Sequence, residues 1–574
     1  MRKLYFAGCV IAAVACLGGC TKTNDIEPVS KGVDFFAHVD NVDTKTSIDG
    51  LQVLWAKKDS IAIQVTEKHL HNASNPGEYA TTLGIYKLAD DAAGTNVGRF
   101  TYIRGAEQIE GDEEFFAFYP ASYCTANKGN GYFYVDFPMT QWYEDNIGDK
   151  LPLPMYGIGS DRNVDFKYAG AVIKLRVWSK EKTSIHSCVI SAYNLSKRAF
   201  TYVKDGEWQP LSKAYDVNNL NMNMRKPLEI SNDESNPTVI TMIIPLAGTK
   251  KLTNLKFSIN CEKGGSELEK KSPLEVKPGT VVTFPVKELT IEPDRMFVDG
   301  LEGEIDTAWV KTAKDSVRVT MVSASKLHED VFRNIMKATR SLENKIVLDL
   351  SGANAEKSIL QGLTDNKYVG FCGGSNRDNG IKNISKFSLP EGITTILNRA
   401  FAYSGYTEIV LPSTLTQISG SPSNGCDSLV WKVAAGNKSF KADEEGALYD
   451  FGMTTLMVLN GGSGDSYIVK DGTTTIREWA LYENSVIKKL TIPASVTKLS
   501  ADCISGTPNL TTIICLGTEP AEFKPNSGTN KVGPSDKTKT LYVPNGCVEI
   551  YKKMWAVLLA EGNWEVKEVK ELQN

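Results

Sequence analysis

The sequence is poor in histidine and lacks the short motifs by which many enzymes are recognised. Only five of its 574 residues are histidines. It contains no HExxH, no GxSxG, no P-loop and no cysteine–histidine nucleophile signature. His69 and His71 alternate in KHLHNASNPG, where a loop is favoured over a metal site. We therefore expect a protein that is not an enzyme. Carboxylate pairs of the glycosidase kind stay open, since they need only meet in space, but nothing points to them.

Metal ligands at ordinary spacings are missing as well. No two cysteines form CxxC, and no histidine stands at ligand spacing from a cysteine, so we expect neither a metal nor a cofactor. Several acidic groups could line a calcium site, but none has the spacing of an EF-hand loop, which favours solvated loop charges. These groups are Asp40 with Asp43, Asp90 with Asp91, and Asp112 with Glu113 and Glu114.

A strong charge of either sign is also absent. The formal net charge is −4 and no basic block stands out, which argues against a nucleic-acid partner. Eight cysteines follow Cys20. An even number permits disulfides in an exported protein, but spacing does not separate disulfides from small buried thiols, which are the simpler reading. They are Cys124, Cys188, Cys261, Cys372, Cys426, Cys503, Cys515 and Cys547.

The chain begins with the layout of a bacterial export signal. A positive start, MRK, precedes the apolar run Leu4–Leu17, which is shorter than the ~20 residues of a membrane span. The run ends in LGGC, which resembles the lipobox of bacterial lipoproteins, where small residues admit a peptidase and the cysteine takes the lipid. The resemblance implies a signal peptide over 1–19, a lipidated tether over 20–30 and these site residues: Leu17, Gly18 and Gly19 before the lipidated Cys20.

No later stretch is long and apolar enough to span a bilayer, so we expect the lipid to be the membrane anchor. Acidic residues soon after the cysteine, Asp25 and Glu27, resemble the surface-export signals of Bacteroidetes lipoproteins. The expected location is the outer membrane, with the body exposed at the cell surface. The sequence leaves the periplasmic face open, where a scaffold or a helper for glycan capture would be the expected role.

Short strands bounded by proline, glycine or aspartate dominate residues 31–290, a pattern typical of β-sandwiches. The ordered elements TKTSIDG, WAKKD, FYPAS, LPM and a late KPG resemble the fimbrillin-like proteins of Bacteroidetes. The resemblance implies two transthyretin-like β-sandwich subdomains, over 31–163 and 164–290, with a break near Asp161 to Asp165. Some members swap strands in pili after trimming behind an arginine. Here the first arginine after the lipidated cysteine is Arg99, which fits a fixed anchor or a stand-alone surface protein better.

Two features lead into the C-terminal part of the chain. Residues 291–310 are acidic and marked by glycine and proline, so we predict a linker. Residues 311–380 contain apolar side chains close to a 3.6-residue period, which predicts an amphipathic helix, followed by the strand KIVLDLSGA. We expect this segment to cap a repeat array, with Ser323 or Ser325 as the helix N-cap and His328 on the surface.

A pattern recurs over residues 381–569. LPEGITTILNRAF (389–401) returns as VKDGTTTIREWAL (469–481) and IPASVTKLSADCI (492–504). The step is 22 from Leu389 to Leu411 and 23 from Ile492 to Cys515, and a fixed period of this size predicts a solenoid with parallel strands. The expected core positions are Ile384, Phe387, Leu389, Tyr406, Ile409, Leu411, Ile487, Leu490, Ile492, Leu510, Ile513 and Cys515, with Ile396, Ile418, Ile476 and Leu499 seven residues on, and closing pairs such as Ala400-Phe401, Ala480-Leu481 and Cys503-Ile504.

The repeats resemble the BspA-type leucine-rich repeat of bacterial surface proteins. The insert 441–463 looks like that family's hairpin-bearing irregular repeat, and the end of the chain looks like its closing segment. No serine, histidine or carboxylate recurs at a fixed slot, so the repeats build a surface and not a repeated active site. We expect a lipid-anchored cell-surface protein that adheres to an unknown protein or glycan through its repeats. The alternative is a fimbrial anchor or accessory subunit that binds pilin subunits by donor-strand exchange.

Overall fold

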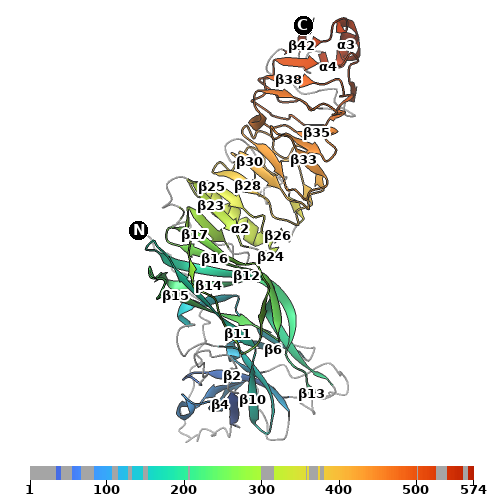
Figure 1. Ribbon diagram of the computed structural model, residues 1–574. Coiled ribbons are helices and arrows are strands. Elements are labelled where there is room, and N and C mark those ends of the chain that lie inside the picture. The colour runs from blue at the N-terminus through green and yellow to red at the C-terminus, as the bar shows by residue number, and fades with distance from the viewer. Residues whose placement is uncertain are drawn as a thin grey trace, which may run out of the picture.

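The protein is elongated, and it is described here by a computed structural model (Figure 1). A β-barrel lies at one end, a β-sandwich follows, and a repeat array extends to the other end. The structure describes residues 34–39, 55–65, 83–105, 114–126, 132–145, 153–204, 207–298, 310, 316–322, 324–356, 358–360, 373–374, 380–500, 502–524, 539–559 and 566–573.

The first unit is a sheet whose hydrogen bonds close on themselves, where the sequence predicted one sandwich. Alternating side chains of its strands fill the interior. Trp55 is 1% exposed and meets the rings of Phe100 and Tyr119 edge to face, with centroids 4.9 and 5.4 Å away. In order around the barrel, the strands are β1 (Phe35–Val39), β10 (Asn163–Tyr168), β9 (Met155–Ser160), β5 (Phe115–Tyr119), β2 (Ser60–Val65), β3 (Gly84–Leu88) and β4 (Val97–Gly105).

The second unit is a sandwich of two sheets, as the sequence predicted. Its larger sheet is built on two long strands, β12 (Ser184–Lys204) and β14 (Ser212–Glu229), paired antiparallel with several register shifts. Apolar side chains of the two sheets meet in one core, which includes Ile173, Ile190 and Phe257. The same sheet includes β8 (Thr140–Trp142), β13 (Glu207–Trp208), β16 (Lys250–Cys261), β17 (Gly264–Lys270), β18 (Leu274–Val276) and β21 (Glu292–Pro293). The other sheet contains β11 (Gly170–Trp178), β15 (Thr238–Pro245), β19 (Val281–Thr283) and β20 (Lys287–Glu288).

The chain passes between these units at a different place from the predicted break. Asp161 and Arg162 form the tight turn of the β9–β10 hairpin, both with positive φ, so the barrel continues to Tyr168. The change of sheet comes at β11. In addition, β6 (Cys124–Ala126), β7 (Tyr132–Asp136) and β8 belong by sequence to the first unit but join the sheet of the second. Local patterns do not reveal this exchange, because it depends on pairing between distant strands.

An apolar interface joins the barrel to the sandwich. Every residue of β5 is buried, because its two faces pack on different cores. Phe115 points into the barrel, whereas Phe116 points outward and meets Phe133 of β7 with ring centroids 5.0 Å apart. Burial of both faces explains why FFAFY reads as a continuous apolar run and not as an alternation.

The predicted linker contains ordered strands in its described part. β21 pairs with the sandwich strand β17, and β22 (Arg295–Val298) pairs in parallel with β23 (Ser316–Met321) of the next sheet. The side chain of Asn260 holds the backbone of Phe297, accepting from its N–H at 2.8 Å and donating to its carbonyl at 2.9 Å. The Phe297 ring packs on Val189 and Val322. Residues 292–298 therefore join the two halves by a packed contact, which corrects this part of the linker prediction.

The cap helix is confirmed and its start is corrected. α2 spans Glu329–Arg340 and buries Val331, Phe332, Ile335, Met336 and Thr339. His328 is the N-cap residue and makes no capping bond through its side chain. Ser325, one of the predicted caps, lies in the strand β24 (Ala324–Leu327), and Ser323 lies outside the described residues. Glu329 and Asp330 in the first turn compensate, since acidic groups favour a helix N-terminus.

Parallel strands stack along the array as the repeat pattern predicted. One sheet runs β22, β23, β25 (Lys345–Asp349), β28 (Ile384–Ser388), β30 (Glu408–Leu411) and β32 (Val430–Val433), so it starts in the cap. A second runs β36 (Ser466–Ile468), β38 (Lys489–Ile492), β40 (Thr512–Cys515), β42 (Lys539–Val543) and β43 (Val566–Glu571). Short strands line the opposite side: β27 (Ile359–Leu360), β29 (Thr395–Ile396), β31 (Gln417–Ile418), β37 (Thr475–Ile476), β39 (Lys498–Ser500) and β41 (Glu522–Lys524).

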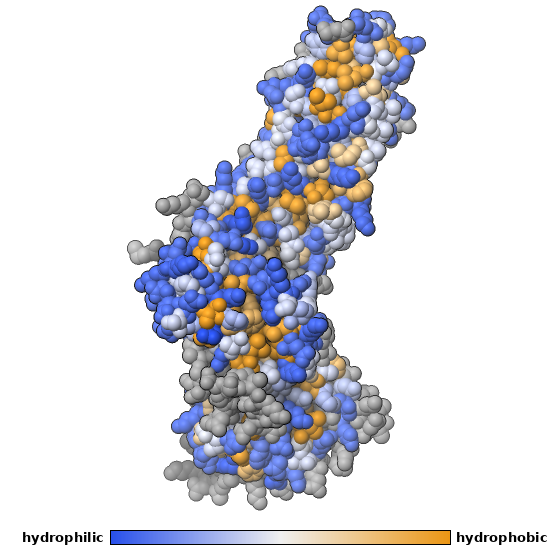
Figure 2. Space-filling model, in the orientation of Figure 1, coloured by the Kyte–Doolittle hydropathy of each residue, from blue (hydrophilic) through white to orange (hydrophobic). Residues whose placement is uncertain are grey.

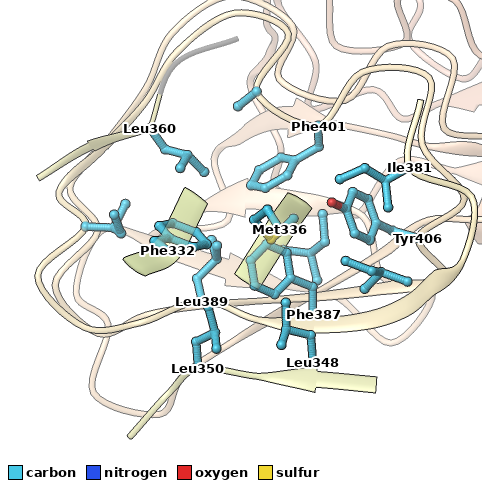
Figure 3. Packing of buried hydrophobic residues seen from close by; sticks show 14 of the residues in the cluster. Phe332, Met336, Leu348, Leu350, Leu360, Ile381, Phe387, Leu389, Phe401 and Tyr406 are labelled. Carbon is cyan, nitrogen blue, oxygen red and sulfur yellow. The ribbon is translucent and has the colours of Figure 1, made fainter. Parts of the chain in front are cut away.

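The predicted core positions of the repeats are confirmed. All of those named from the sequence are at most 5% exposed. Phe387 and Tyr406, in successive coils, stack with ring centroids 5.9 Å apart. Figure 3 shows these rings with Phe401 above them and with Phe332 and Met336 of α2 closing the end of the stack. The cap therefore covers the open apolar face of the first coil.

The insert and the closing segment also take the predicted form. β33 (Phe440–Ala442), β34 (Leu448–Asp450) and β35 (Thr455–Val458) pair antiparallel, so the irregular repeat carries a hairpin. At the end of the array, α3 (Val548–Met554) and α4 (Ala556–Leu559) place the buried rings of Tyr551 and Trp555 against the last coils. None of the helices in the described residues has the length and hydrophobicity needed to cross a membrane.

Candidate functional site

The predicted lipidation site lies outside the described residues. Leu17, Gly18, Gly19 and Cys20 therefore have no geometry to report. The same holds for His69, His71, Asp40 and Asp43. Lipidation at Cys20 stays a prediction from the sequence.

Cysteines in the described residues are unpaired thiols, and most of them are buried. Burial raises the pKa of the Cys503 thiol to about 12 and that of Cys515 higher still, so both thiols stay protonated and unreactive at neutral pH. Cys426 donates to the carbonyl of Phe401 at 3.1 Å. The buried cysteines therefore act as small core residues. Within the described residues, no three histidine, cysteine or acidic side chains gather as metal ligands would.

The outward side chains of the first array sheet, which we call the N-terminal sheet face, are largely charged. Parallel register aligns one side chain per strand into a row across the sheet. One such row runs from Arg318 through Val347, Lys386 and Glu408 to Val430. Nζ of Lys386 lies 3.8 Å from Oε1 of Glu408 on the neighbouring strand. This face suits polar contacts.

The second array sheet presents a different row, which we call the C-terminal sheet face. Its register aligns Ile468, Thr491, Ile514 and Tyr542. Ile468 is 65% exposed, the largest exposure among the big apolar side chains of the described residues. Figure 2 shows hydrophobic residues breaking the hydrophilic surface at this end of the molecule. In the rest of this row, Thr491 is buried and Ile514 and Tyr542 are half-buried. Ile468 therefore gives this face an exposed apolar side chain that a partner could contact.

A third cluster lies on the turns that follow the short strands. Glu483 accepts from the Tyr403 hydroxyl and from Asn424 Nδ2, both at 3.2 Å, although these two residues precede it by 80 and 59 positions. The irregular repeat lies between them in sequence. In this repeat, β35 ends at Val458 and a 3₁₀ helix follows at Gly461–Ser463. The irregular repeat therefore has no turn like those that hold Tyr403, Asn424 and Glu483 in their coils. Glu483 thus bridges from the coil after the hairpin to the two coils before it.

Arg477 makes a similar bridge. Its Nη2 donates to the carbonyl of Ile418 at 3.0 Å, 59 positions away, at the open edge of β31. Its Nη1 is buried and has no hydrogen-bond partner among the described residues. Burial lowers the pKa of the Arg477 guanidinium. We call Tyr403, Asn424, Tyr482 and Glu483 the rim cluster.

In the barrel, the first strand is held in place. β1 pairs with β10 on one side and β4 on the other. Arg99 of β4 contacts Asp34, just before β1, at 3.2 Å and Asp91 at 2.8 Å. The arginine that the sequence singled out therefore lies within a paired strand and fastens the start of β1.

The repeat pattern predicted the core but named none of these surface residues. In the sheets, the signal was available in the positions that alternate with the apolar ones. In the rim cluster it was not, because the contacts depend on how far the irregular repeat separates the coils. His328, predicted at the surface, is exposed, and its Nδ1 lies 2.8 Å from a Glu356 carboxylate oxygen.

Comparison with known families supports the repeat assignment. Residues 378–441 and 460–523 match, in six copies, the family described as the BspA type leucine rich repeat region. The unmatched segment between them falls within the predicted irregular repeat. Together with the parallel stacking, this match confirms that the C-terminal half is a leucine-rich repeat solenoid within a mainly β protein. No curated protein matches the chain.

Solved structures similar to parts of this chain include both adhesion-related and repeat proteins. A candidate cell adhesion protein from Bacteroides ovatus is 14% identical, with 46% of this chain and 95% of that chain covered at a TM-score of 0.29. A leucine-rich repeat protein from Eubacterium ventriosum is 16% identical, with 49% and 79% covered at 0.26. The tip fimbrial protein Mfa3 from Porphyromonas gingivalis, truncated at its C-terminus, is 11% identical, with 46% and 96% covered at 0.21. Likeness at these scores carries no functional argument.

Proposed function

We propose that the protein is a lipid-anchored adhesion protein of the bacterial cell surface, which binds a protein or glycan partner through its repeat array. The observation that carries this proposal is the difference between core positions and outward positions within each coil. Core positions stay apolar from coil to coil, whereas outward positions differ, with Lys386 and Glu408 on one sheet and Ile468 on the other. A rigid stack of this kind offers many separate contacts over an extended surface.

In this proposal, the barrel and the sandwich hold the array away from the membrane. The array starts on β22, which follows the last sandwich strand after a single residue, Asp294. Asn260 and the packed Phe297 ring fix that junction. A surface held away from the membrane on packed domains would meet its partner with little loss of orientational freedom on binding.

The first test asks where the array lies. Protease is added to intact cells that make the full-length protein, and the array is detected by blotting, with Cys20→Ala as the anchoring control. We expect digestion of the array on unbroken cells. Complete protection until the outer membrane is broken would place the body in the periplasm and end the adhesion proposal.

A second test asks whether the array binds. Cells displaying the full-length protein are offered immobilised matrix proteins, glycans and neighbouring cells, and retention is compared with cells that carry the double variant Ile468→Ser, Tyr542→Ala. A second double variant, Lys386→Ala with Glu408→Ala, tests the N-terminal sheet face in the same way. Retention that depends on either pair supports the proposal. If the protein is exposed but mediates no retention in any arm, the proposal is wrong.

The fimbrial alternative receives less support. Donor-strand exchange needs a position for an incoming strand, and β1 already fills the position between β10 and β4. The Arg99 contacts with Asp34 and Asp91 stabilise that arrangement. Co-purification of pilin subunits with the full-length protein would favour this alternative over adhesion.

A further inference from the structure

We propose that β43 is a docking edge for a second copy of this protein, which adds to it as an antiparallel strand. The pairing itself does not depend on the proposed adhesion function, but its use in joining two cells rests on that function. Three observations support the inference: an edge without a partner strand in the described residues, a charge pattern that complements its own reverse, and a position at the end of the molecule.

β43 pairs on one side only, with β42, and is the last strand of the second array sheet. No strand among the described residues lies along its other side. The N–H of Leu572 donates to the carbonyl of Val543 at 2.8 Å, so the backbone groups at Leu572 point toward β42. Because these groups alternate in direction along a strand, those of Glu571 and Val569 point away from the sheet. They are available to an added strand.

The side chains along this edge carry charges in an order that suits a reversed copy. Lys567 and Glu568 precede Val569, and Lys570 and Glu571 follow it, with all four charged side chains exposed. An antiparallel copy centred on Val569 puts its Lys570 opposite Glu568. The same arrangement puts its Glu571 opposite Lys567. Each pair occurs twice because the arrangement is symmetric, and opposite charges facing each other across two strands stabilise a sheet.

Other registers bring like charges together. Residues that face each other in an antiparallel pair must both direct their backbone groups the same way, so the register changes in steps of two residues. One step puts Glu568 opposite Glu568, or Lys570 opposite Lys570, of the second copy. A parallel copy in register puts every charge opposite its own kind. Charged side chains ordinarily protect an edge strand from pairing, but that protection needs like charges to meet, and the register centred on Val569 avoids this.

The centre of the proposed pair is also favourable in detail. Val569 exchanges both backbone hydrogen bonds with its counterpart, and Glu568 and Lys570 fall at the positions where side chains of two antiparallel strands come closest. Within one strand, Nζ of Lys570 already contacts a carboxylate oxygen of Glu568. Two such pairs facing each other place opposite charges on every side of a square. The register shift between β42 and β43 falls at Lys567, outside this centre.

The position of β43 determines which molecules the pairing joins. The two-fold axis of an antiparallel strand pair is perpendicular to the sheet, so the two sheets continue each other and the two arrays point in opposite directions. The end of the array, with β42, lies at the end of the molecule away from the barrel (Figure 1). The pairing therefore puts the two barrels at opposite ends of the dimer. This geometry suits copies on two facing cells and not neighbours on one membrane.

The test is sedimentation equilibrium of the full-length protein in detergent, at up to about 300 μM, because a short strand pair buries less surface than a standard interface. Two exchange variants change the order of charges but not the composition: Lys567→Glu with Glu568→Lys, and Lys570→Glu with Glu571→Lys. Each puts like charges opposite each other, so we expect the dimer to weaken roughly tenfold or more. The first variant keeps the Glu571 carboxylate, which accepts from the Gly546 N–H at 2.8 Å.

An equimolar mixture of the two exchange variants tests the register. In the mixed pair every charge again faces an opposite charge, so we expect a heterodimer about as tight as the wild-type dimer. The matched control is Glu568→Lys with Lys570→Glu, which keeps opposite charges across the pair and should dimerise like the wild type. Melting temperatures of all variants are compared. If an exchange variant does not fold, Lys567→Glu alone replaces it and should still weaken the dimer.

Three results would overturn the inference: a wild type that stays monomeric at the highest concentration, a dimer that the exchange variants leave unchanged, and a mixture that forms no heterodimer. The role in joining cells is tested separately. Cells that display one exchange variant should clump only when mixed with cells that display the other, whereas wild-type cells should clump by themselves.

The two kinds of measurement separate this inference from the adhesion function. A dimer in solution without clumping refutes the role in joining cells and leaves the dimer. Retention on matrix proteins or glycans by a protein that stays monomeric refutes the dimer and leaves the adhesion function.

Discussion

The N-terminal half and the repeat array bury their apolar faces through contacts of very different range. In the sandwich, the side chain of Gln141 pairs with both backbone groups of Ile243, 102 positions away, at 2.5 and 3.0 Å. In the array, the Thr416 hydroxyl donates to the carbonyl of Thr394, only 22 positions away. The stability of the N-terminal half thus depends on strands that are distant in sequence. The stability of the array is a sum of contacts between neighbouring coils.

Because of this difference, the loss of one side chain should destabilise a larger region in the barrel than in the array. In the barrel, each ring contacts strands from several parts of the chain, so its loss should weaken the whole unit. In the array, a defect should be felt by its own coil and the coils on either side. The irregular repeat is the exception, since Glu483 and Arg477 reach across it. Variants in the two halves should therefore differ in how far their effects spread.

Removing the central barrel ring should have the largest effect. Trp55→Ala is expected to lower the free energy of unfolding of the barrel by about 3–5 kcal/mol, because it opens a cavity among Phe100, Tyr119 and Phe166. Denaturant unfolding of the full chain, followed by tryptophan fluorescence and amide exchange, would measure it. Trp142→Ala, 39% exposed, is the control and should cost less than about 1 kcal/mol. Weakening of the array to the same extent would contradict the contrast.

In the array, the junction with the irregular repeat should be the most sensitive polar site. Asn460 accepts from the Ser423 hydroxyl and from Trp431 Nε1, both at 2.9 Å, and donates to the Ser423 carbonyl at 3.0 Å. Asn460→Ala should lower the stability of the array by about 2–4 kcal/mol, because it leaves buried groups unpaired.

The control for Asn460→Ala is Gln417→Ala on the surface of the array, which should change stability by less than about 0.5 kcal/mol. Hydrogen exchange resolved by residue would show whether protection falls only near the junction. A uniform loss over all coils would mean that the array unfolds as one unit.

The contact between the halves should give an intermediate effect. Asn260→Ala removes both bonds to the Phe297 backbone, and exchange of the Phe297 amide should rise roughly 5- to 150-fold, corresponding to about 1–3 kcal/mol. Asn260→Asp keeps the acceptor for that amide and should preserve more of its protection. If neither change affects the amide, the side chain does not hold the junction.

The smallest effect is a pH dependence within the hairpin repeat. Asp443 accepts from the Tyr467 hydroxyl, and Tyr467 and Tyr449 share a 2.7 Å hydrogen bond. Burial, opposed by the hydrogen bonds from the Tyr467 hydroxyl and the Ala447 N–H, raises the pKa of the Asp443 carboxyl in the folded state. The folded state therefore binds its proton more tightly than the unfolded state, and this contribution to stability falls as pH rises from the ordinary carboxyl pKa through the raised value.

Carboxyl NMR of Asp443 would measure this titration. Tyr467→Phe should raise the pKa of Asp443 further, because it removes a hydrogen bond to the charged form. Asp443→Asn should lose the pH dependence of stability in that window. A pKa of Asp443 below the ordinary value would contradict the prediction.

Particular residues show how far sequence reasoning reaches in each half. Leu490, Ile492 and Leu499 were assigned to the core from the period alone, and they are buried. Thr473 stands where other coils have an apolar residue. It is buried, and its hydroxyl contacts the carbonyl of Met453 and the side chain of Tyr449. In the N-terminal half, the sequence located strands but not the point where the chain changes sheet. Turn signals at Asp161 could not show that this turn lies within a hairpin of the barrel.

The β character of both halves and the core positions of the repeats follow from the sequence alone, because each depends on composition or on a period within about 25 residues. Three features depend on the tertiary structure: which strands close the barrel, how the array joins the sandwich and which residues meet in the rim cluster. Closing the barrel pairs Phe36 with Asn163, 127 positions away, and no local pattern carries information over such a distance. The candidate binding surface belongs to this second group, since side chains that face solvent obey no packing period.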